Sequence, residues 1–229
     1  MAMVTWRLSG STLMVRKGDD MARRWTINGR FLSQPTTGVQ RYAREVVHSL
    51  DALIAEQEPL ARGLELSLHC PPGSGDIPLA FMERREIGRT SGHVWEQVQL
   101  ASSLDGSGLL SLCNTGPLLS RKHIVCIHDA NVWNAPQSYS LAFKLLYRNL
   151  LPGLGKTACG ISTVSNYSLD ELVRRGVIPA ERAFVAPNGH EHALRWKPEH
   201  SAQTRLAASR CICCRSCCSF RLSERPARR

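Results

Sequence analysis

The sequence predicts an α/β fold in which helices flank a parallel sheet. Short apolar segments of strand length alternate several times with longer segments whose apolar residues recur at helical spacing. Polar residues directly follow several of the apolar segments, and ligands of open parallel sheets bind beyond the carboxyl ends of the strands. The pattern therefore favours a doubly wound sheet with a binding site at that edge.

Six segments are predicted to be strands, because they are short and rich in β-branched and other apolar residues. They are residues 25–29, 64–70, 109–113, 123–129, 159–164 and 183–186. Residues 77–92 show no clear period, and Glu83–Glu86 within them is expected to be a solvated surface.

Four segments are predicted to be helices. Thr37 and Gln40 have the spacing of a capping box at the start of the first. Its apolar face consists of Val39, Tyr42, Ala43, Val46, Val47 and Leu50. The other helices are His93–Leu100, residues 138–151, and a segment that a second capping box at Ser168 and Glu171 opens and Gly176 and Pro179 end.

The start of the first helix is a candidate anion site. A strand, a turn with Gly38 and a helix N-terminus follow one another here, and free backbone N–H groups at a helix N-terminus suit a phosphate. Glycine lets a ligand approach the backbone closely. A plain tight turn explains the same residues equally well, so both interpretations remain open.

His128 and Asp129 are the candidate catalytic residues, because they end an apolar strand with an imidazole beside a carboxylate. Asn114 and Ser165 follow what we expect to be neighbouring strands. Such an imidazole could donate a hydrogen bond to a sugar hydroxyl or a phosphate, and Asp129 could orient it. A structural histidine bonded to the adjacent loop is the alternative. Residues 1–200 show no spacing typical of metal ligands.

Composition limits the location of the chain. No apolar run reaches the ~18–20 residues of a spanning helix, and no secretory signal is evident, so a cytoplasmic location is expected.

The scattered cysteines 70, 113, 126 and 159 are predicted to be reduced and buried. The net charge of +10 belongs mostly to residues 201–229, which contain seven arginines and one glutamate.

Several motifs, in this order, resemble one family. They are residues 27–32 (INGRFL), 37–43 (TGVQRYA), 95–97 (WEQ), 112–117 (LCNTGP), 127–129 (IHD), 163–168 (TVSNYS) and 187–189 (PNG). Together they resemble the N-terminal domain of bacterial family 4 glycosyltransferases, the retaining GT-B group, and within it the mannosyl- and rhamnosyltransferase-like members of polysaccharide clusters. The resemblance covers residues 24–195.

The resemblance implies a Rossmann-like domain that binds the acceptor and closes over a nucleotide-diphosphate sugar, without a metal or other cofactor. Gly38, with Val39 and Arg41 of the same motif, is expected to bind substrate near the donor diphosphate. His128 corresponds to the family's histidine near the transferred sugar, and Ser165 to a residue at the cleft edge. The acceptor would be a glycan or a lipid-linked sugar, with peripheral contact with the inner membrane. No specific binding of nucleic acid is expected.

The sequence departs from the family after Trp196, where a second, donor-binding domain would begin. We therefore expect an extension over residues 1–20, a GT-B N-terminal domain over 21–198 and an Arg/Cys-rich tail over 199–229. The tail is read as a frame-shifted segment, a zinc knot or a basic arm for nucleic acid. The expected function is that of a truncated hexosyltransferase, inactive alone. A non-catalytic phosphate- or sugar-binding module, whose tail binds nucleic acid or metal, is the alternative.

Overall fold

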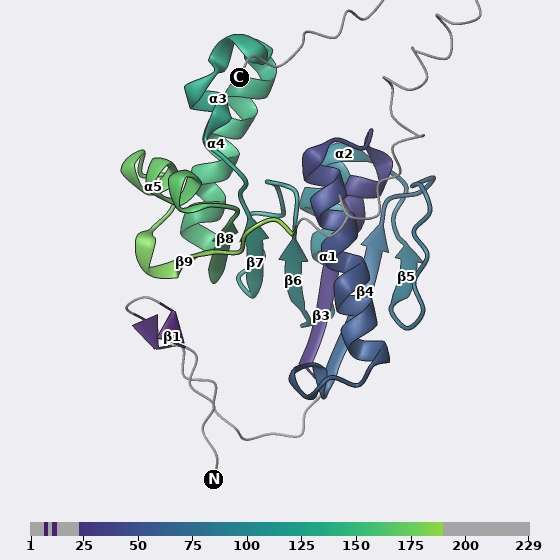
Figure 1. Cartoon of the computed structure of the whole chain (residues 1–229). Helices are drawn as coiled ribbons and strands as arrows, with labels where there is room; N and C mark the ends of the chain where they lie inside the picture. Colours follow the sequence, from purple (N-terminus) through teal and green to yellow (C-terminus); the bar gives the residue numbers. More distant parts are fainter. Residues whose placement is uncertain (1–6, 9–10, 13–22, 190–229) are drawn as a thin grey trace, which may run out of the picture. The chain divides into compact units, whose positions relative to one another are not determined.

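A seven-stranded, all-parallel sheet forms the centre of the computed structural model, which describes residues 7–8, 11–12 and 23–189 (Figure 1). The strand order is β5-β4-β3-β6-β7-β8-β9. The strands are β3 (Arg23–Asn28), β4 (Leu64–Cys70), β5 (Glu83–Glu86), β6 (Gly108–Ser111), β7 (His123–Cys126), β8 (Gly160–Thr163) and β9 (Ala183–Val185). This is a Rossmann-like order, in which the chain moves outward from β3 to β5 and returns to continue at β6.

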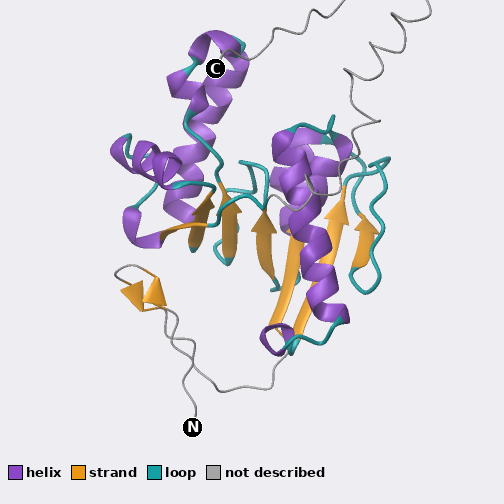
Figure 2. Cartoon of the chain, viewed as in Figure 1, coloured by secondary structure: helices purple, strands orange, loops and turns teal. Residues whose placement is uncertain are grey.

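The described residues also form five α-helices, which lie beside the sheet (Figure 2). They are α1 (Gly38–Ala55), α2 (Gly92–Val94), α3 (Asn131–Asn134), α4 (Leu141–Thr157) and α5 (Asn166–Arg174). A π-helical turn, η3 (Trp95–Leu100), continues α2 directly, and a 3-10 turn, η1 (Gly29–Ser33), follows β3. None of the described helices is long and apolar enough to cross a membrane.

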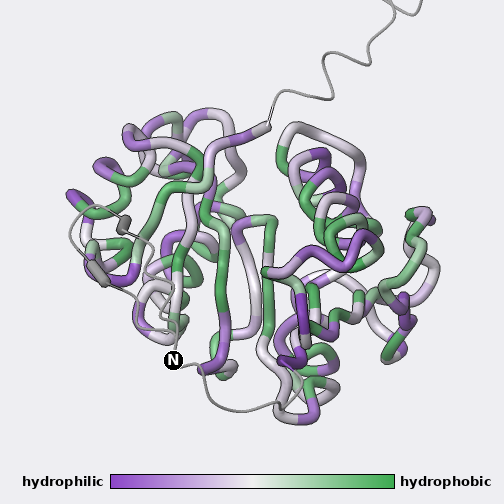
Figure 3. Tube along the Cα trace, turned by 60° about the horizontal axis from the view of Figure 1, so that its bottom comes forward, coloured by the Kyte–Doolittle hydropathy of each residue, from purple (hydrophilic) through white to green (hydrophobic). Residues whose placement is uncertain are grey.

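Alternation along the strands places helices on both faces of the sheet. Ile27 and Leu68 pack with α1 on one face. On the other, Leu109 packs with η3, and Val125 and Ile161 pack with α4. Hydrophobic segments run accordingly along the central strands in Figure 3. The predicted α/β fold with a parallel sheet flanked by helices is confirmed.

A buried carboxylate ties α1 to the connection between β4 and β5. Asp51 accepts hydrogen bonds from the backbone N–H groups of Ala80, Phe81 and Met82, at 2.6, 3.0 and 2.6 Å. Burial alone would raise the pKa of Asp51, but these donors lower it below its ordinary value. The carboxylate therefore fixes an irregular segment that would otherwise have no partner for three amide groups.

Three predicted elements differ from the structure. Glu83–Glu86 is the edge strand β5 rather than only a solvated surface, since parallel pairing with β4 outweighs its polar composition. The last long helix starts after Ser165, whose hydroxyl accepts from Ser168 N at 3.1 Å, so the capping box at Ser168 was wrong. The third change is that α4 continues past its predicted end at residue 151, through Pro152, to Thr157.

Packing explains the longer α4. Leu154 is fully buried in the core, and Gly155 lies so close to the following chain that a Cβ there would be 2.0 Å from Val177 O. Tertiary contacts thus outweigh the local helix-breaking tendency of Pro152.

Two further expectations meet the structure only in part. Cys70 and Cys126 are buried free thiols, but Cys113 is half-buried and Cys159 is exposed. Within the expected extension, Arg7–Leu8 and Ser11–Thr12 pair as the antiparallel strands β1 and β2. The expected tail, residues 199–229, lies outside the described residues. Residues 1–188 form one compact unit of the chain, of which the structure describes residues 7–8, 11–12 and 23–188.

Replacement of Asp51 by alanine should lower the free energy of unfolding by about 2–4 kcal/mol, because three amide groups lose a charged acceptor. Urea unfolding followed by circular dichroism measures this change. The exposed Asp170 of α5 provides the control, since Asp170→Ala should alter stability by less than about 0.5 kcal/mol. Equal effects of the two substitutions would contradict the anchoring role of Asp51.

Candidate functional site

A cleft of about 370 Å³ opens at the carboxyl ends of β3, β6 and β7. It lies where the strand order reverses between β3 and β6, which is the usual ligand position in doubly wound sheets. Three groups of residues line it. They are Arg30, Cys113, Asn114 and Asp129 from the strand ends, Gln34, Thr37, Val39 and Gln40 from the start of α1, and Val132, Tyr139, Phe143, Tyr147 and Leu151 from the α3–α4 region.

A buried ion pair adjoins the cleft, and its arginine, Arg30, is among the lining residues. Arg30 Nε donates to Glu96 Oε1 at 3.1 Å, and Arg30 Nη2 donates to Thr115 Oγ1 at 2.6 Å. The same Glu96 oxygen accepts from Asn28 Nδ2 at 2.7 Å and from Thr115 Oγ1 at 3.0 Å. Because Arg30 follows β3, Glu96 lies on η3 and Thr115 follows β6, this network joins three separate segments at the cleft.

Glu96 is fully buried and ionised. Burial alone would raise its pKa, but His93, Arg30 and the two neutral donors hold the pKa below its ordinary value. Its position depends on the π-helical turn, which sends consecutive side chains to different partners. Trp95 Nε1 donates to Ile87 O at 2.8 Å, and Gln97 Nε2 donates to Gly116 O at 2.8 Å. The π-turn therefore holds both the ion pair and the loop after β6.

The N-terminus of α1 borders the cleft through Thr37, Val39 and Gln40, whereas Gly38 is not among the lining residues. Thr37 N donates to Gln40 Oε1 at 3.1 Å, which is the Gln40 half of the capping box. Val39 lines the cleft, whereas Arg41 is exposed and is not among the lining residues. No atom lies within 4 Å of a Cβ built on Gly38. Packing therefore does not require glycine there.

His128 lies beneath the cleft rather than in its lining. Its Nε2 lies 2.9 Å from Leu112 O and donates to that carbonyl, and its ring meets Tyr42 edge-on at 4.8 Å between centroids. Burial lowers the pKa of His128, although the Leu112 carbonyl and Asp129 oppose this effect. The ring is thus neutral near pH 7, with Nδ1 as its accepting nitrogen.

Asp129 and Asn114 both line the cleft and also have structural contacts. Asp129 Oδ1 accepts from Asn131 N at 2.8 Å, so it caps α3 and is not bonded to His128. Asn114 has a positive φ of 64°, and its Oδ1 accepts from His128 N at 2.7 Å. Its amide nitrogen makes no hydrogen bond among the described residues. Ser165 caps α5 and does not line the cleft.

An aromatic wall, formed by Tyr139, Phe143 and Tyr147, was not predicted as part of the site. Phe143 stacks on Tyr147 with 3.9 Å between ring centroids and on Tyr139 with 4.9 Å. Phe143 and Tyr147 are four residues apart on α4, a spacing that brings side chains together on a helix face. Tyr139 lies four residues before Phe143, just ahead of the helix. This spacing is the sequence signal that could have revealed the wall. Aromatic faces of this kind suit the C–H faces of a sugar ring.

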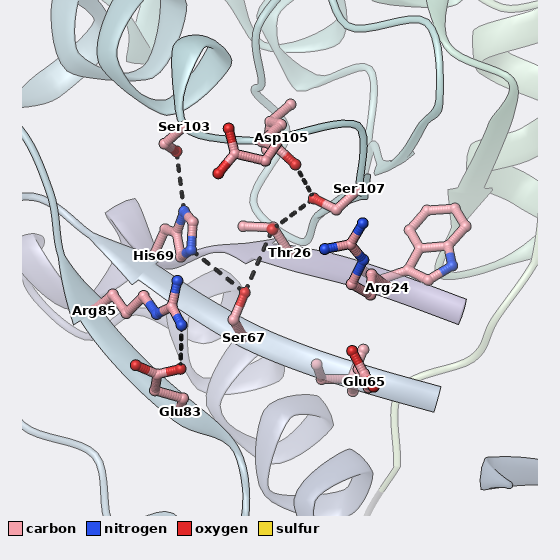
Figure 4. A pocket seen from close by; sticks show the side chains of 13 residues that line it. Arg24, Thr26, Glu65, Ser67, His69, Glu83, Arg85, Ser103, Asp105 and Ser107 are labelled. Atoms are coloured by element: carbon pink, nitrogen blue, oxygen red, sulfur yellow. Dashed lines mark hydrogen bonds and ion pairs between the residues drawn. The ribbon is translucent and has the colours of Figure 1, made fainter. Parts of the chain in front are cut away.

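A second pocket of about 270 Å³ lies on the sheet face opposite α1, over β3, β4 and β5 (Figure 4). His69 Nδ1 lies 2.9 Å from Ser103 Oγ, and its Nε2 lies 3.3 Å from Ser67 Oγ. Thr26 Oγ1 continues this ladder to Ser67 and to Ser107, at 3.4 and 2.9 Å. Because these polar groups bond mainly to one another, the cleft at the switch point is the better candidate site.

The described residues contain no group of three or more His, Cys, Asp or Glu side chains that could hold a metal ion. No protein-family model matches the chain, and no curated protein matches it at significant similarity.

Replacement of Glu96 by glutamine should cost about 3–5 kcal/mol in free energy of unfolding, because the buried Arg30 charge loses its counterion while the side-chain volume hardly changes. Chemical unfolding measures the loss. Glu86→Gln is the matched control, since Glu86 pairs with Arg84 at the surface and should contribute less than about 1 kcal/mol. A loss below about 1 kcal/mol for Glu96→Gln would contradict the role given to the pair.

Acid should weaken the fold through His123, which is fully buried beside Ser111. Burial lowers the pKa of His123 from 6.5 to about 4. The unfolded state therefore binds more protons in this window, and the free energy of unfolding falls as the pH drops from 6.5 towards 4. Over the whole of this pH window, protonation of the unfolded state at His123 lowers the free energy of unfolding by about 3 kcal/mol. Urea unfolding between pH 7 and pH 4.5 should show a shallower decline for His123→Gln than for the control His48→Gln, and identical slopes would contradict this assignment.

Proposed function

We propose that residues 23–189 form the acceptor-side domain of a retaining GT-B glycosyltransferase. Such an enzyme transfers a hexose from a nucleotide-diphosphate sugar to a glycan or lipid-linked acceptor in the synthesis of cell-surface polysaccharide, in the cytoplasm. One observation carries the proposal. A helix N-terminus, a fixed guanidinium and an aromatic wall line a single cleft at the switch point of the sheet.

Each part of the cleft suits one part of the donor. The N-terminus of α1 favours a phosphate through its free N–H groups and its dipole. Arg30 adds a positive charge that Glu96 and Thr115 hold in place. Negative charge builds on the leaving diphosphate during transfer, so preorganised donors and cations at this place stabilise the transition state.

The remaining groups suit a sugar. The aromatic wall offers a flat apolar surface to the ring, while Asn114 Nδ2 can donate to a sugar hydroxyl. The second oxygen of Asp129 can accept from a hydroxyl, since only Oδ1 is used to cap α3. His128 acts as a positioning residue, because its buried ring and its backbone N–H hold Leu112 and Asn114 in place. In this proposal Ser165 and Arg41 have no direct contact with the sugar.

A non-catalytic sugar- or phosphate-binding module is the second candidate. The contacts of the two candidate catalytic residues favour this module. The His128 ring donates to the Leu112 carbonyl, and Asp129 accepts from the first N–H group of α3. Neither side chain lies beside the other as an acid–base pair would. Specificity for the intact donor separates the two candidates, since a phosphate-binding module would recognise the diphosphate alone.

Titration of the protein with nucleoside-diphosphate hexoses, followed by NMR, tests the proposal. Shifts should gather at Arg30, Val39 and Asn114, and an intact donor such as GDP-mannose or dTDP-rhamnose should bind more tightly than inorganic pyrophosphate. Phe143→Ala should weaken binding of the intact donor about tenfold by removal of a stacking ring, while Leu145→Ala, on the outer side of the same helix, should not.

Two results would overturn the proposal. Equal affinity for pyrophosphate and for every nucleotide sugar would favour the binding module. Shifts confined to His69 and its neighbours would place the ligand in the second pocket. Residues 23–189 supply one of the two domains that hold substrates in a GT-B enzyme, so binding is the appropriate measurement on this part of the chain.

A further inference from the structure

The floor of the second pocket is a chain of five hydrogen-bonding side chains, which we call the ladder. In Figure 4, His69 lies between Ser103 and Ser67, and Thr26 lies between Ser67 and Ser107. His69 is only 5% exposed and Thr26 only 2% exposed. The polar atoms in the middle of the ladder therefore depend on one another and on whatever enters the pocket.

The two ends of the ladder fix the direction of its outer hydrogen bonds. Ser103 Oγ and Ser107 Oγ each donate to a backbone carbonyl three residues earlier, at 2.9 and 2.6 Å. Because a hydroxyl has one proton, neither serine can also donate to the ladder. His69 Nδ1 therefore donates to Ser103, and Thr26 Oγ1 donates to Ser107. A neutral His69 ring then has Nε2 as an acceptor.

One proton is missing in the middle of the ladder. Ser67 Oγ lies 3.3 Å from His69 Nε2 and 3.4 Å from Thr26 Oγ1. Since the protons of His69 and Thr26 are already used, the Ser67 hydroxyl has one proton for two acceptors. Its two contacts are also the longest in the ladder. A buried acceptor without a donor is unfavourable, so the floor of the pocket favours a ligand that brings a hydrogen-bond donor.

The rim of the pocket favours a positively charged ligand. Three carboxylates, of Glu65, Glu83 and Asp105, line it together with the guanidinium groups of Arg24 and Arg85. Arg85 pairs with Glu83, whereas Glu65 and Asp105 form no ion pair with a described residue. An anion would bring neither a donor for the floor nor a positive charge for these two carboxylates. A protonated amine brings both.

We propose that the second pocket binds a small ligand through a primary ammonium group. An ammonium group has three donors and no acceptor. One N–H group donates to His69 Nε2 or Thr26 Oγ1, whichever Ser67 leaves without a donor, and the others face the rim carboxylates. The pocket volume of about 270 Å³ lies just below the range of about 300–1,000 Å³ for drug-sized ligands, which suits an amino sugar or a short alkyl amine. The assignment does not depend on the proposed function.

A proton on His69 would compete with such a ligand. The protonated ring would donate from Nε2 to Ser67, the Ser67 proton would turn to Thr26, and all four contacts would be made. The charged groups that line the pocket with His69 are Arg24, Glu65, Glu83, Arg85 and Asp105. Burial lowers the pKa of His69 most, a rim arginine lowers it further, and two of the rim carboxylates oppose both effects. The ring is thus neutral near pH 7, and ligand binding should weaken as the pH falls towards 5.

Calorimetric titration of the full chain with glucosamine and with glucose tests the proposal. The two sugars differ at one position, where glucosamine carries an ammonium group and glucose a hydroxyl, so glucosamine should bind at least about tenfold more tightly. Thr26→Val removes one acceptor at Ser67 without a change of shape, so the remaining contacts have enough protons. This variant should bind glucosamine about tenfold more weakly. Thr157→Val is the matched control, because Thr157 donates to Gly153 O on α4, and it should bind as the unchanged chain does.

Ethanolamine separates two sources of the ammonium group. Affinity equal to that of glucosamine would support recognition of the amine alone, and weaker binding would support an amino sugar. Its affinity should also fall between pH 7 and pH 5, and a constant affinity would contradict competition with a proton on His69. Equal affinity for glucosamine and glucose, or unchanged binding by Thr26→Val, would overturn the proposal. Nucleotide-sugar binding in the cleft should be the same in Thr26→Val, so failure of this proposal is distinct from failure of the proposed function.

Discussion

The buried ion pair between Arg30 and Glu96 is the interaction on which the site depends. A buried pair of charges is tolerated only when the remaining donors and acceptors are satisfied, and here Asn28, Thr115 and His93 contribute those contacts. The pair joins the end of β3, the π-turn η3 and the loop after β6 across the point where the strand order reverses. Whatever binds in the cleft meets a guanidinium whose direction the fold has already set.

The residues of the cleft floor are fixed in position in the same way. His128 and Asn114 hold one another and the ends of β6 and β7 in register, and Asp129 starts α3. These residues shape the cleft floor from strand ends that cannot move independently. The groups left to meet a ligand are the α1 N-terminus, Arg30, the Asn114 amide nitrogen and the aromatic wall. They offer hydrogen-bond donors, a positive charge and flat apolar faces to the cleft.

The sequence predicted the sheet well because its strands are buried and therefore apolar. It predicted β5 poorly, since an edge strand of four charged residues has no hydrophobic pattern and is stabilised by backbone pairing with β4. Position at strand ends was sufficient to place Asn114 and Asp129 at the cleft, while their role in binding stays a prediction. The role of Glu96 was not predicted, although the segment Trp95–Gln97 was noted, because its partners Asn28, Arg30 and Thr115 lie far away in the sequence. Side-chain partners of this kind are set by topology.

The two sides of α4 present different surfaces. The first half of α4 stands clear of the sheet (Figure 1), with rings on the side of the cleft and exposed leucines on another side. The rings face a cleft whose polar groups suit a sugar and a diphosphate. The leucines leave an apolar surface on the side of α4 turned away from the cleft. Because Tyr139, Phe143 and Tyr147 stack on one another, the stacking itself holds this wall of the cleft in shape.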